Sequence, residues 1–192
     1  MTPICRRLQA TLRHLAPLLV GVALLAACGG TPPPPPPPDP TPSPTATATC
    51  PPSGVAIEVG EVEPAMGLRA LGLRLTNCGT DPYTVNGYPA VRVLDAERKP
   101  IPVTVGNGSS PVSAPDAYDA PPKAVTLRPG ESATARVLWR NTVTDSTVPA
   151  AEGSYLEIAP TAGEDAQTVA VEGGIDLGTT GRLAVNAWAV RS

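Results

Sequence analysis

The chain has 192 residues, among them 14 lysines and arginines, 17 aspartates and glutamates and a single histidine, and its formal net charge is −3 at pH 7. Only 3% of the residues are aromatic and phenylalanine is absent, so any core must be built mainly from Val, Leu, Ile and Ala. The acidic balance argues against a protein that binds nucleic acid, because contacts to phosphate require an excess of Lys and Arg.

The first 27 residues have the pattern of an export signal. Three arginines and no acidic residue precede an apolar run over residues 15–25, which is too short to span a bilayer as a lasting helix. The run ends in the sequence Leu-Ala-Ala-Cys-Gly at residues 25–29, which resembles the lipobox of bacterial lipoproteins. We therefore expect residues 1–27 to be removed as a lipoprotein signal peptide and Cys28 to carry lipid. An ordinary secretory signal with a chance cysteine is the alternative.

Processing before Cys28 would change both the charge and the chemistry of the chain. It removes three basic residues and no acidic one, which leaves a net charge of −6, and it removes His14, the only histidine. Each lipid methylene that enters a bilayer contributes about 0.8 kcal/mol, so a cysteine with more than one acyl chain is firmly anchored. The expected location is the extracytoplasmic face of a bacterial cell membrane, with the domain at the cell surface.

Residues 28–49 are expected to form a disordered stalk between the lipid and the folded domain. The segment is rich in Pro, Thr, Ala and Ser and contains seven consecutive prolines at positions 32–38. Proline-rich chain adopts the extended polyproline II conformation at about 3.1 Å per residue, so the segment that follows Cys28 can reach roughly 65 Å. Its spaced threonines also suit O-glycosylation, and a bare linker is the alternative.

Residues 50–192 have the length of one domain and the pattern of β-strands. Apolar and polar residues alternate in short runs that Gly, Pro, Asn and Asp interrupt, and no stretch keeps a helical period. The alternating runs are Val55–Val59, Leu71–Leu75, Val91–Val93, Ala133–Trp139, Leu156–Ile158, Val169–Val171 and Leu183–Val190. Seven to nine strands of this kind predict an all-β fold, namely an immunoglobulin-like antiparallel β-sandwich.

Two turns between these strands can be assigned from their Pro and Gly residues. The sequence Pro-Ala-Met-Gly at residues 64–67 separates the first two runs, and Arg-Pro-Gly-Glu at residues 128–131 precedes the run that begins at Ala133. In the second sequence, Pro stands where φ near −65° is wanted and Gly where φ is positive, as in a type II turn. These residues are therefore structural and do not form a phosphate-binding loop.

Cys50 and Cys78 are the remaining thiols of the processed chain, and export makes a disulfide between them the expected state. If the first two runs form a hairpin that turns near residues 64–66, the numbers of paired residues sum to about 128, which places these cysteines opposite each other. Such a bridge would contribute on the order of 3 kcal/mol. Two reactive or metal-binding thiols are the alternative, without a histidine or a CxxC spacing to support them.

Three sequence motifs carry a resemblance to a known family. They are Leu-Thr-Asn-Cys-Gly at residues 75–79, Gly-Tyr-Pro-Ala-Val at 87–91 and Leu-Arg-Pro-Gly-Glu-Ser-Ala at 127–133. With a cysteine at the start of the domain, this order resembles the domain of unknown function 4232 of actinobacterial lipoproteins. The resemblance implies an immunoglobulin-like sandwich on the bacterial surface and brings no established activity. Members usually place the second cysteine a few residues later and often have a further cysteine pair, which is missing here.

Few residues of the processed chain suit catalysis, because removal of His14 excludes serine–histidine and cysteine–histidine arrangements. Carboxylate pairs remain, Asp116 with Asp119 and Glu164 with Asp165, and could serve a hydrolase of cell-wall glycans or bind calcium. Both pairs lie in Gly- and Pro-rich loops, where solvated charge is the simpler explanation. We expect no enzyme, no cofactor and no metal.

The long segment over residues 106–123 is the candidate binding surface. Loops of this length in compact domains are usually functional or disordered, and Tyr118 between Asp116 and Asp119 could anchor a partner. An insertion without consequence is the alternative. We expect a surface module that binds a cell-wall or envelope protein partner and no nucleic acid; a structural spacer without a ligand is the second hypothesis.

Overall fold

A computed structural model of the chain describes residues 50–114 and 119–190. The predicted signal peptide, lipidation site and stalk lie outside these ranges. The described residues contain eleven strands. They are β1 (Val55–Ala65), β2 (Leu68–Asn77), β3 (Tyr83–Val85), β4 (Ala90–Leu94), β5 (Thr104–Asn107), β6 (Val125–Leu127), β7 (Ser132–Arg140), β8 (Glu152–Ala159), β9 (Gln167–Asp176), β10 (Arg182–Val185) and β11 (Ala189–Val190).

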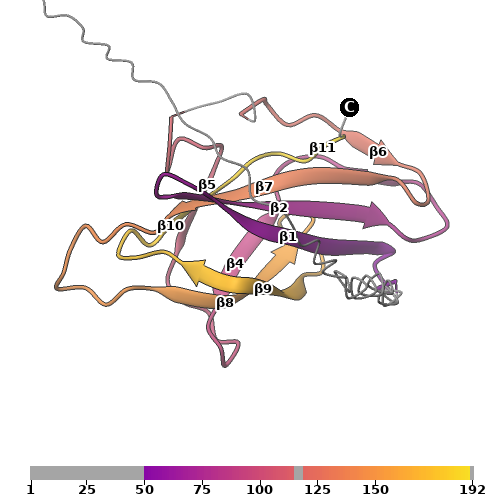
Figure 1. Cartoon of the computed structure of the whole chain (residues 1–192). Helices are drawn as coiled ribbons and strands as arrows, with labels where there is room; N and C mark the ends of the chain where they lie inside the picture. Colours follow the sequence, from indigo (N-terminus) through magenta and orange to yellow (C-terminus); the bar gives the residue numbers. More distant parts are fainter. Residues whose placement is uncertain (1–49, 115–118, 191–192) are drawn as a thin grey trace, which may run out of the picture. The chain divides into compact units, whose positions relative to one another are not determined.

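The strands form a large sheet and two smaller ones (Figure 1). The large sheet has the order β1-β2-β7-β10-β5, with β11 also paired to β7, and the smaller sheets are β4-β8-β9 and β3-β6. The predicted all-β fold is confirmed. The strand number exceeds the predicted seven to nine, and β5 pairs with β10 in parallel rather than antiparallel. Strand β4 belongs to the sheet β4-β8-β9, so β5 does not pair with the strand before it. The chain crosses to the large sheet after β4, and β5 then pairs with the edge strand β10.

The core lies between the sheets and follows the alternation seen in the sequence. Successive side chains of a strand point to opposite faces, and the inward positions of β2 and β7 are buried leucines, alanines and valines. They pack with residues of β4, β8 and β9 in one cluster. Trp139 and Trp188 are 1% and 2% exposed.

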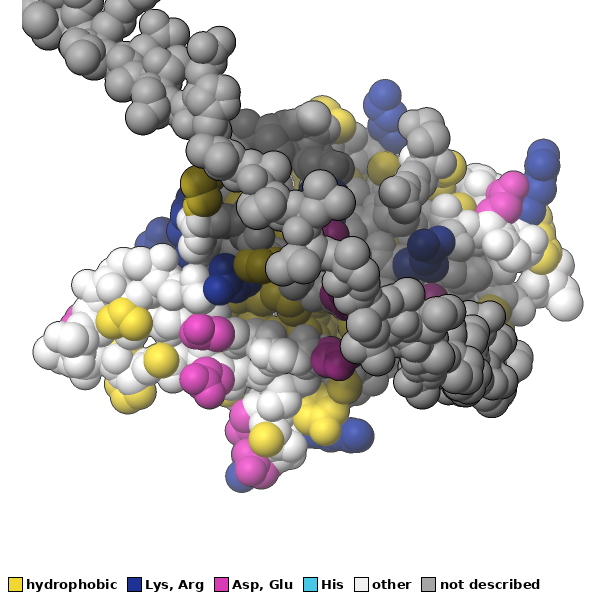
Figure 2. All heavy atoms as spheres, in the orientation of Figure 1, with side chains coloured by type: hydrophobic (Ala, Val, Ile, Leu, Met, Phe, Trp, Pro, Cys, Tyr) yellow, Lys and Arg dark blue, Asp and Glu magenta, His cyan; other side chains and the backbone are white. Residues whose placement is uncertain are grey.

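On the described part of the face in Figure 2, acidic and basic side chains are interspersed, so no large patch of a single charge sign appears there.

The register of the β1–β2 hairpin differs from the predicted one. The numbers of paired residues sum to 132 from Val55 to Val59 and to 133 from Val62 to Ala65, with a bulge between the two stretches, and not to 128. The turn consists of Met66 and Gly67, whose φ angles of 45° and 77° suit a two-residue hairpin turn. The prediction was wrong because it centred the turn on the proline at position 64, whereas the positive φ angles occur two and three residues later, at Met66 and Gly67.

The predicted disulfide between Cys50 and Cys78 is present, with 5.6 Å between the Cα atoms. The cysteines approach by a path that the predicted register did not include. Prolines 51 and 52 cannot donate to a ladder, and the amide of Gly54 donates instead to the carbonyl of Pro51 at 2.9 Å. This turn folds the chain back, and the carbonyl of Gly54 accepts from the amide of Cys78 at 3.0 Å.

The predicted turn at residues 128–131 is confirmed, and it meets the end of β2. The amide of Glu131 donates to the carbonyl of Arg128 at 2.9 Å, and Gly130 has φ of 84°. The amide of Gly130 donates to the carbonyl of Asn77 at 2.7 Å, and the amide of Asn77 donates to the carbonyl of Glu131 at 3.0 Å. Two of the family-like motifs are thus joined through their main chains.

Candidate ligand-binding groove

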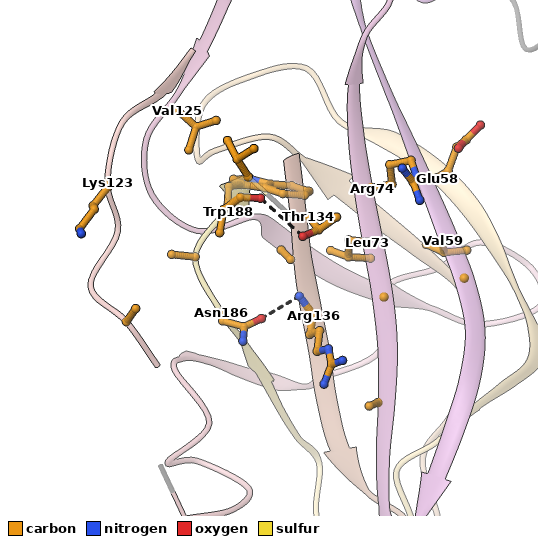
Figure 3. A pocket seen from close by; sticks show the side chains of 18 of the residues that line it. Glu58, Val59, Leu73, Arg74, Lys123, Val125, Thr134, Arg136, Asn186 and Trp188 are labelled. Carbon is orange, nitrogen blue, oxygen red and sulfur yellow. Dashed lines mark hydrogen bonds between the residues drawn. The ribbon is translucent and has the colours of Figure 1, made fainter. Parts of the chain in front are cut away.

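A groove of about 860 Å³ lies on the outer face of β1, β2 and β7, opposite to the core side (Figure 3). The chain segments 120–125 and 186–190 form its side walls. Ligand sites usually measure a few hundred to a thousand Å³, so the groove has room for a small molecule or a short stretch of polymer.

Glycines form the floor of the groove at the centre of two neighbouring strands. Gly72 lies on the outer face of β2 between the buried Leu71 and Leu73, and Gly60 lies in the bulge of β1 beside it. Neither residue has a positive φ, and a Cβ atom added to Gly72 would meet no other atom within 4 Å. The backbone does not require glycine here, although glycine in a strand costs roughly 0.5–1 kcal/mol. A glycine within a strand often marks a bulge, as at Gly60, or a place where a ligand or another backbone approaches closely, which is the explanation that remains for Gly72.

Charged side chains stand beside this floor. Arg74 of β2 lies opposite Glu58 of β1 in the ladder, and Arg136 of β7 lies opposite Gly72. The two arginines therefore occupy neighbouring rows on one face of the sheet. Among the described residues, no carboxylate lies within ion-pair distance of Arg74, whose side chain is exposed. Arg74 and Arg136 thus both line the groove beside the glycine floor.

The wall over residues 186–190 is held in place by hydrogen bonds that replace strand pairing. Between β10 and β11, the side-chain oxygen of Asn186 accepts from the main-chain amide of Arg136 at 2.7 Å (Figure 3). The main-chain amide of Asn186 donates to the carbonyl of Arg136 at 3.2 Å. Trp188 then donates from its indole to the carbonyl of Pro160 at 2.7 Å. Asn186 and Trp188 are both buried, so this wall is fixed to the fold.

The predicted binding loop over residues 106–123 divides into parts with different roles. Gly106 and Asn107 end strand β5, and the far end, which includes Pro121 and Lys123, forms the second wall of the groove. Asp119 accepts from the amide of Ser109 at 2.6 Å and also from its hydroxyl, so it fixes the start of the loop. Asp116 and Tyr118, the other predicted loop residues, lie outside the described residues. The binding role predicted for the loop stays a prediction.

The second carboxylate pair lies at a different place, in the turn between β8 and β9. Glu164 accepts hydrogen bonds from the hydroxyls of Tyr83 and Thr161, each at 2.6 Å, and Asp165 is exposed. Burial, followed by the hydrogen bond and the charge of Glu164, raises the pKa of Tyr83.

Within the described ranges, no three His, Cys, Asp or Glu side chains are grouped as metal ligands. In the same ranges, no helix has the length and apolar character to cross a membrane.

The sequence reasoning missed the residues that shape the groove, namely Gly60, Gly72, Arg74, Arg136 and Asn186. The sequence did contain one sign of the groove. Gly72 stands between Leu71 and Leu73, at a position that faces outward in a strand, and no turn nearby explains a glycine there.

Comparison with known proteins gives a family and no individual relative. A family model described as "Domain of unknown function (DUF4232)" matches residues 50–189. No curated protein and no solved structure matches the chain.

Proposed function

The chain belongs to the DUF4232 family, and we propose that it is a non-enzymatic binding module, held at the extracytoplasmic face of the membrane by lipid on Cys28. The family description assigns no activity. Its ligand or partner occupies the groove over β1, β2 and β7.

The glycine floor at Gly60 and Gly72 is the main observation that supports binding in the groove. In a strand that had only a structural role, we would expect a β-branched side chain at an exposed position in the middle of the strand, since such residues favour strands. Glycine at both positions keeps the hollow open at a cost in stability. A structural spacer has no use for such a hollow, which favours binding over the spacer hypothesis.

The lipobox-like sequence at residues 25–29 and the proline-rich segment after it support the anchored location. A binding role without catalysis agrees with how the described carboxylates are used. Glu164 holds Tyr83, and Asp119 holds Ser109, so each carboxylate is committed to a structural hydrogen bond.

Photocrosslinking in intact cells tests the proposal. A photoreactive diazirine analogue of lysine replaces Lys123, an exposed residue on the groove wall, and in a matched control it replaces Lys99, an exposed residue of the turn after β4. We expect a defined adduct from position 123 and none from position 99. No adduct at position 123, or equal adducts at both positions, would contradict a ligand in the groove.

A further inference from the structure

We infer that Asn86, in the connection between β3 and β4, is a site of spontaneous covalent modification. Its side-chain amide is lost as ammonia, and part of the product carries an isoaspartyl bond in the main chain. The reaction needs only water, so it is independent of whether a ligand occupies the groove.

Two of the five asparagines of the chain precede a glycine, namely Asn86 and Asn107. Glycine has no Cβ atom, so its main-chain nitrogen can approach the side chain of the residue before it without steric hindrance. Asparagine is also one of the thermolabile residue types. The sequence alone makes the two positions equivalent, and the structure around them decides which one reacts.

Asn86 has the surroundings that the reaction requires. Its side chain is exposed and forms no hydrogen bond within residues 50–114 and 119–190. The attacking group is the main-chain amide of Gly87, and this amide has no hydrogen-bond acceptor in the same part of the chain. The two groups that must meet are therefore not held apart by other contacts.

Asn107 belongs to the same dipeptide and is protected. It is the last residue of β5, where it pairs with Val185 of β10. The main-chain amide of Gly108 donates to the carbonyl of Val185 at 2.8 Å. Attack by this nitrogen first requires that hydrogen bond to break and the end of β5 to leave β10. Asn107 should therefore react more slowly than Asn86 by about tenfold or more.

The reaction balances with water alone. The main-chain nitrogen of Gly87 forms a bond to the Cγ atom of Asn86 and gives up its proton, while the carbon–nitrogen bond of the side-chain amide breaks and ammonia leaves. Water then opens the resulting cyclic imide at either of its carbonyl groups. One opening gives an aspartate with a normal main chain, and the other gives an isoaspartate, in which the main chain runs through the side-chain carbon.

The isoaspartate lengthens the main chain at a point that is held on both sides. Val85, just before Asn86, is buried in the core, and the carbonyl of Gly87 accepts from the main-chain amide of Trp188 at 3.0 Å. The extra main-chain carbon has to displace one of these two fixed points. A single hydrogen bond is worth less than a buried valine, so the bond to Trp188 should be the one that weakens.

Peptide mapping by mass spectrometry tests the site on the full-length protein, incubated at mildly alkaline pH either folded or in urea. We expect Asn86 to react about tenfold faster than Asn107 in the folded protein. In urea the two should react at similar rates, because the hydrogen bond of Gly108 is then absent. Asn86→Gln is the matched control and should show no loss of amide at that position, because its longer side chain would have to form a larger, less favourable ring.

Hydrogen exchange at the main-chain amide of Trp188 tests the structural consequence. The isoaspartyl form, separated by ion exchange, and the Asn86→Asp variant carry the same negative charge, and only the first has a longer main chain. Exchange should be faster in the isoaspartyl form and unchanged in Asn86→Asp.

The outcomes that would overturn the inference are distinct. Asn86 that stays intact in the folded protein while it reacts in urea, or equal rates at Asn86 and Asn107 in the folded protein, would overturn the assignment of the site. A preference for Asn86 that persists in urea would overturn the protection by β5. Equal exchange at Trp188 in the isoaspartyl form and the unmodified protein would overturn the structural consequence.

Discussion

The side chain of Asn77 donates a hydrogen bond to the carbonyl oxygen of Leu127 at 2.8 Å, although 50 residues separate the two in sequence. The same amide group donates to the carbonyl of Asp81 at 2.8 Å, and its oxygen accepts from the amide of Gly79 at 3.1 Å. Asn77 is only 1% exposed. The end of β2 and the turn before β7 are therefore held together by one buried amide.

Asn77→Ala should lower the free energy of unfolding by about 3 kcal/mol, because three hydrogen bonds at roughly 1 kcal/mol each are lost. Asn77→Asp should be at least as harmful, since a carboxylate cannot donate to two carbonyls. Asn86→Ala, at an exposed asparagine before Gly87, serves as the control with little change. Urea unfolding measures all three variants, and wild-type stability in Asn77→Ala would refute the role of this amide.

The disulfide gives a second stability prediction. Cys50→Ala and Cys78→Ala should each lower the free energy of unfolding by on the order of 3 kcal/mol, because the bridge closes a loop of 28 residues in sequence separation. The double variant should lose no more than either single one, since both remove the same bond. Addition of a reductant to the wild type should reproduce the loss. Additive losses in the double variant would show that the cysteines act separately.

Tyr83 and Glu164 give a prediction for alkaline pH. The hydroxyl of Tyr83 donates to Glu164 at 2.6 Å, and burial together with this carboxylate raises the pKa of Tyr83 above its ordinary value. The unfolded chain therefore releases the phenolic proton at a lower pH than the folded chain, so the stability that Tyr83 contributes is full below about pH 10 and is lost as the pH rises further.

Tyr83→Phe removes this titration and should make the melting temperature fall less steeply above pH 10 than in the wild type. Glu164→Gln should give an intermediate slope, because it removes the charge and retains an acceptor. Melting curves between pH 8 and pH 11.5, roughly the range in which tyrosine titrates, measure the slopes. Parallel curves for wild type and Tyr83→Phe would refute the coupling.

The alternation of apolar residues was sufficient to predict an all-β fold, because inward positions such as Leu71, Leu73 and Leu75 repeat with the period of a strand. The disulfide and the turn at residues 128–131 were also predictable. Each depends on residue types, Cys in one case and Pro and Gly in the other, that few other structures accommodate. The register of β1 against β2 was not, because it depends on a bulge between Val59 and Val62 that alternation does not encode.

The groove was beyond prediction from the sequence because it depends on which strands become neighbours. Arg136 is 64 positions from Gly72 in the chain, and only the pairing of β2 with β7 places them opposite each other. The wall at Asn186 likewise exists because β10 ends and β11 begins on the same partner strand. The sequence instead favoured the loop over residues 106–123, and among its described residues only those of the far end line the groove.

The proposed lipid anchor gives a prediction for localisation. Cys28→Ala should abolish labelling of the protein by a radioactive or clickable fatty acid and should release it into the medium or leave it unprocessed, because Cys28 is the only thiol of the lipobox-like sequence at residues 25–29. Cys78→Ala, which leaves the lipobox intact, is the control and should still be labelled. Lipid labelling that persists in Cys28→Ala would contradict the proposed anchor.

Gly72→Val separates the stability of the fold from the capacity of the groove to hold a ligand. Valine favours strands, and its Cβ has open space, so the free energy of unfolding should rise by roughly 0.5–1 kcal/mol. Thr168→Val, at an exposed position of β9, is the matched control on another sheet.

The decisive measurement is the amount of adduct captured in intact cells by the photoreactive lysine at position 123, at equal protein abundance, in these two backgrounds. We expect that Gly72→Val loses the adduct while the protein remains folded and that Thr168→Val retains it. Undiminished capture by a stably folded Gly72→Val protein would contradict the assignment of the groove as the binding site.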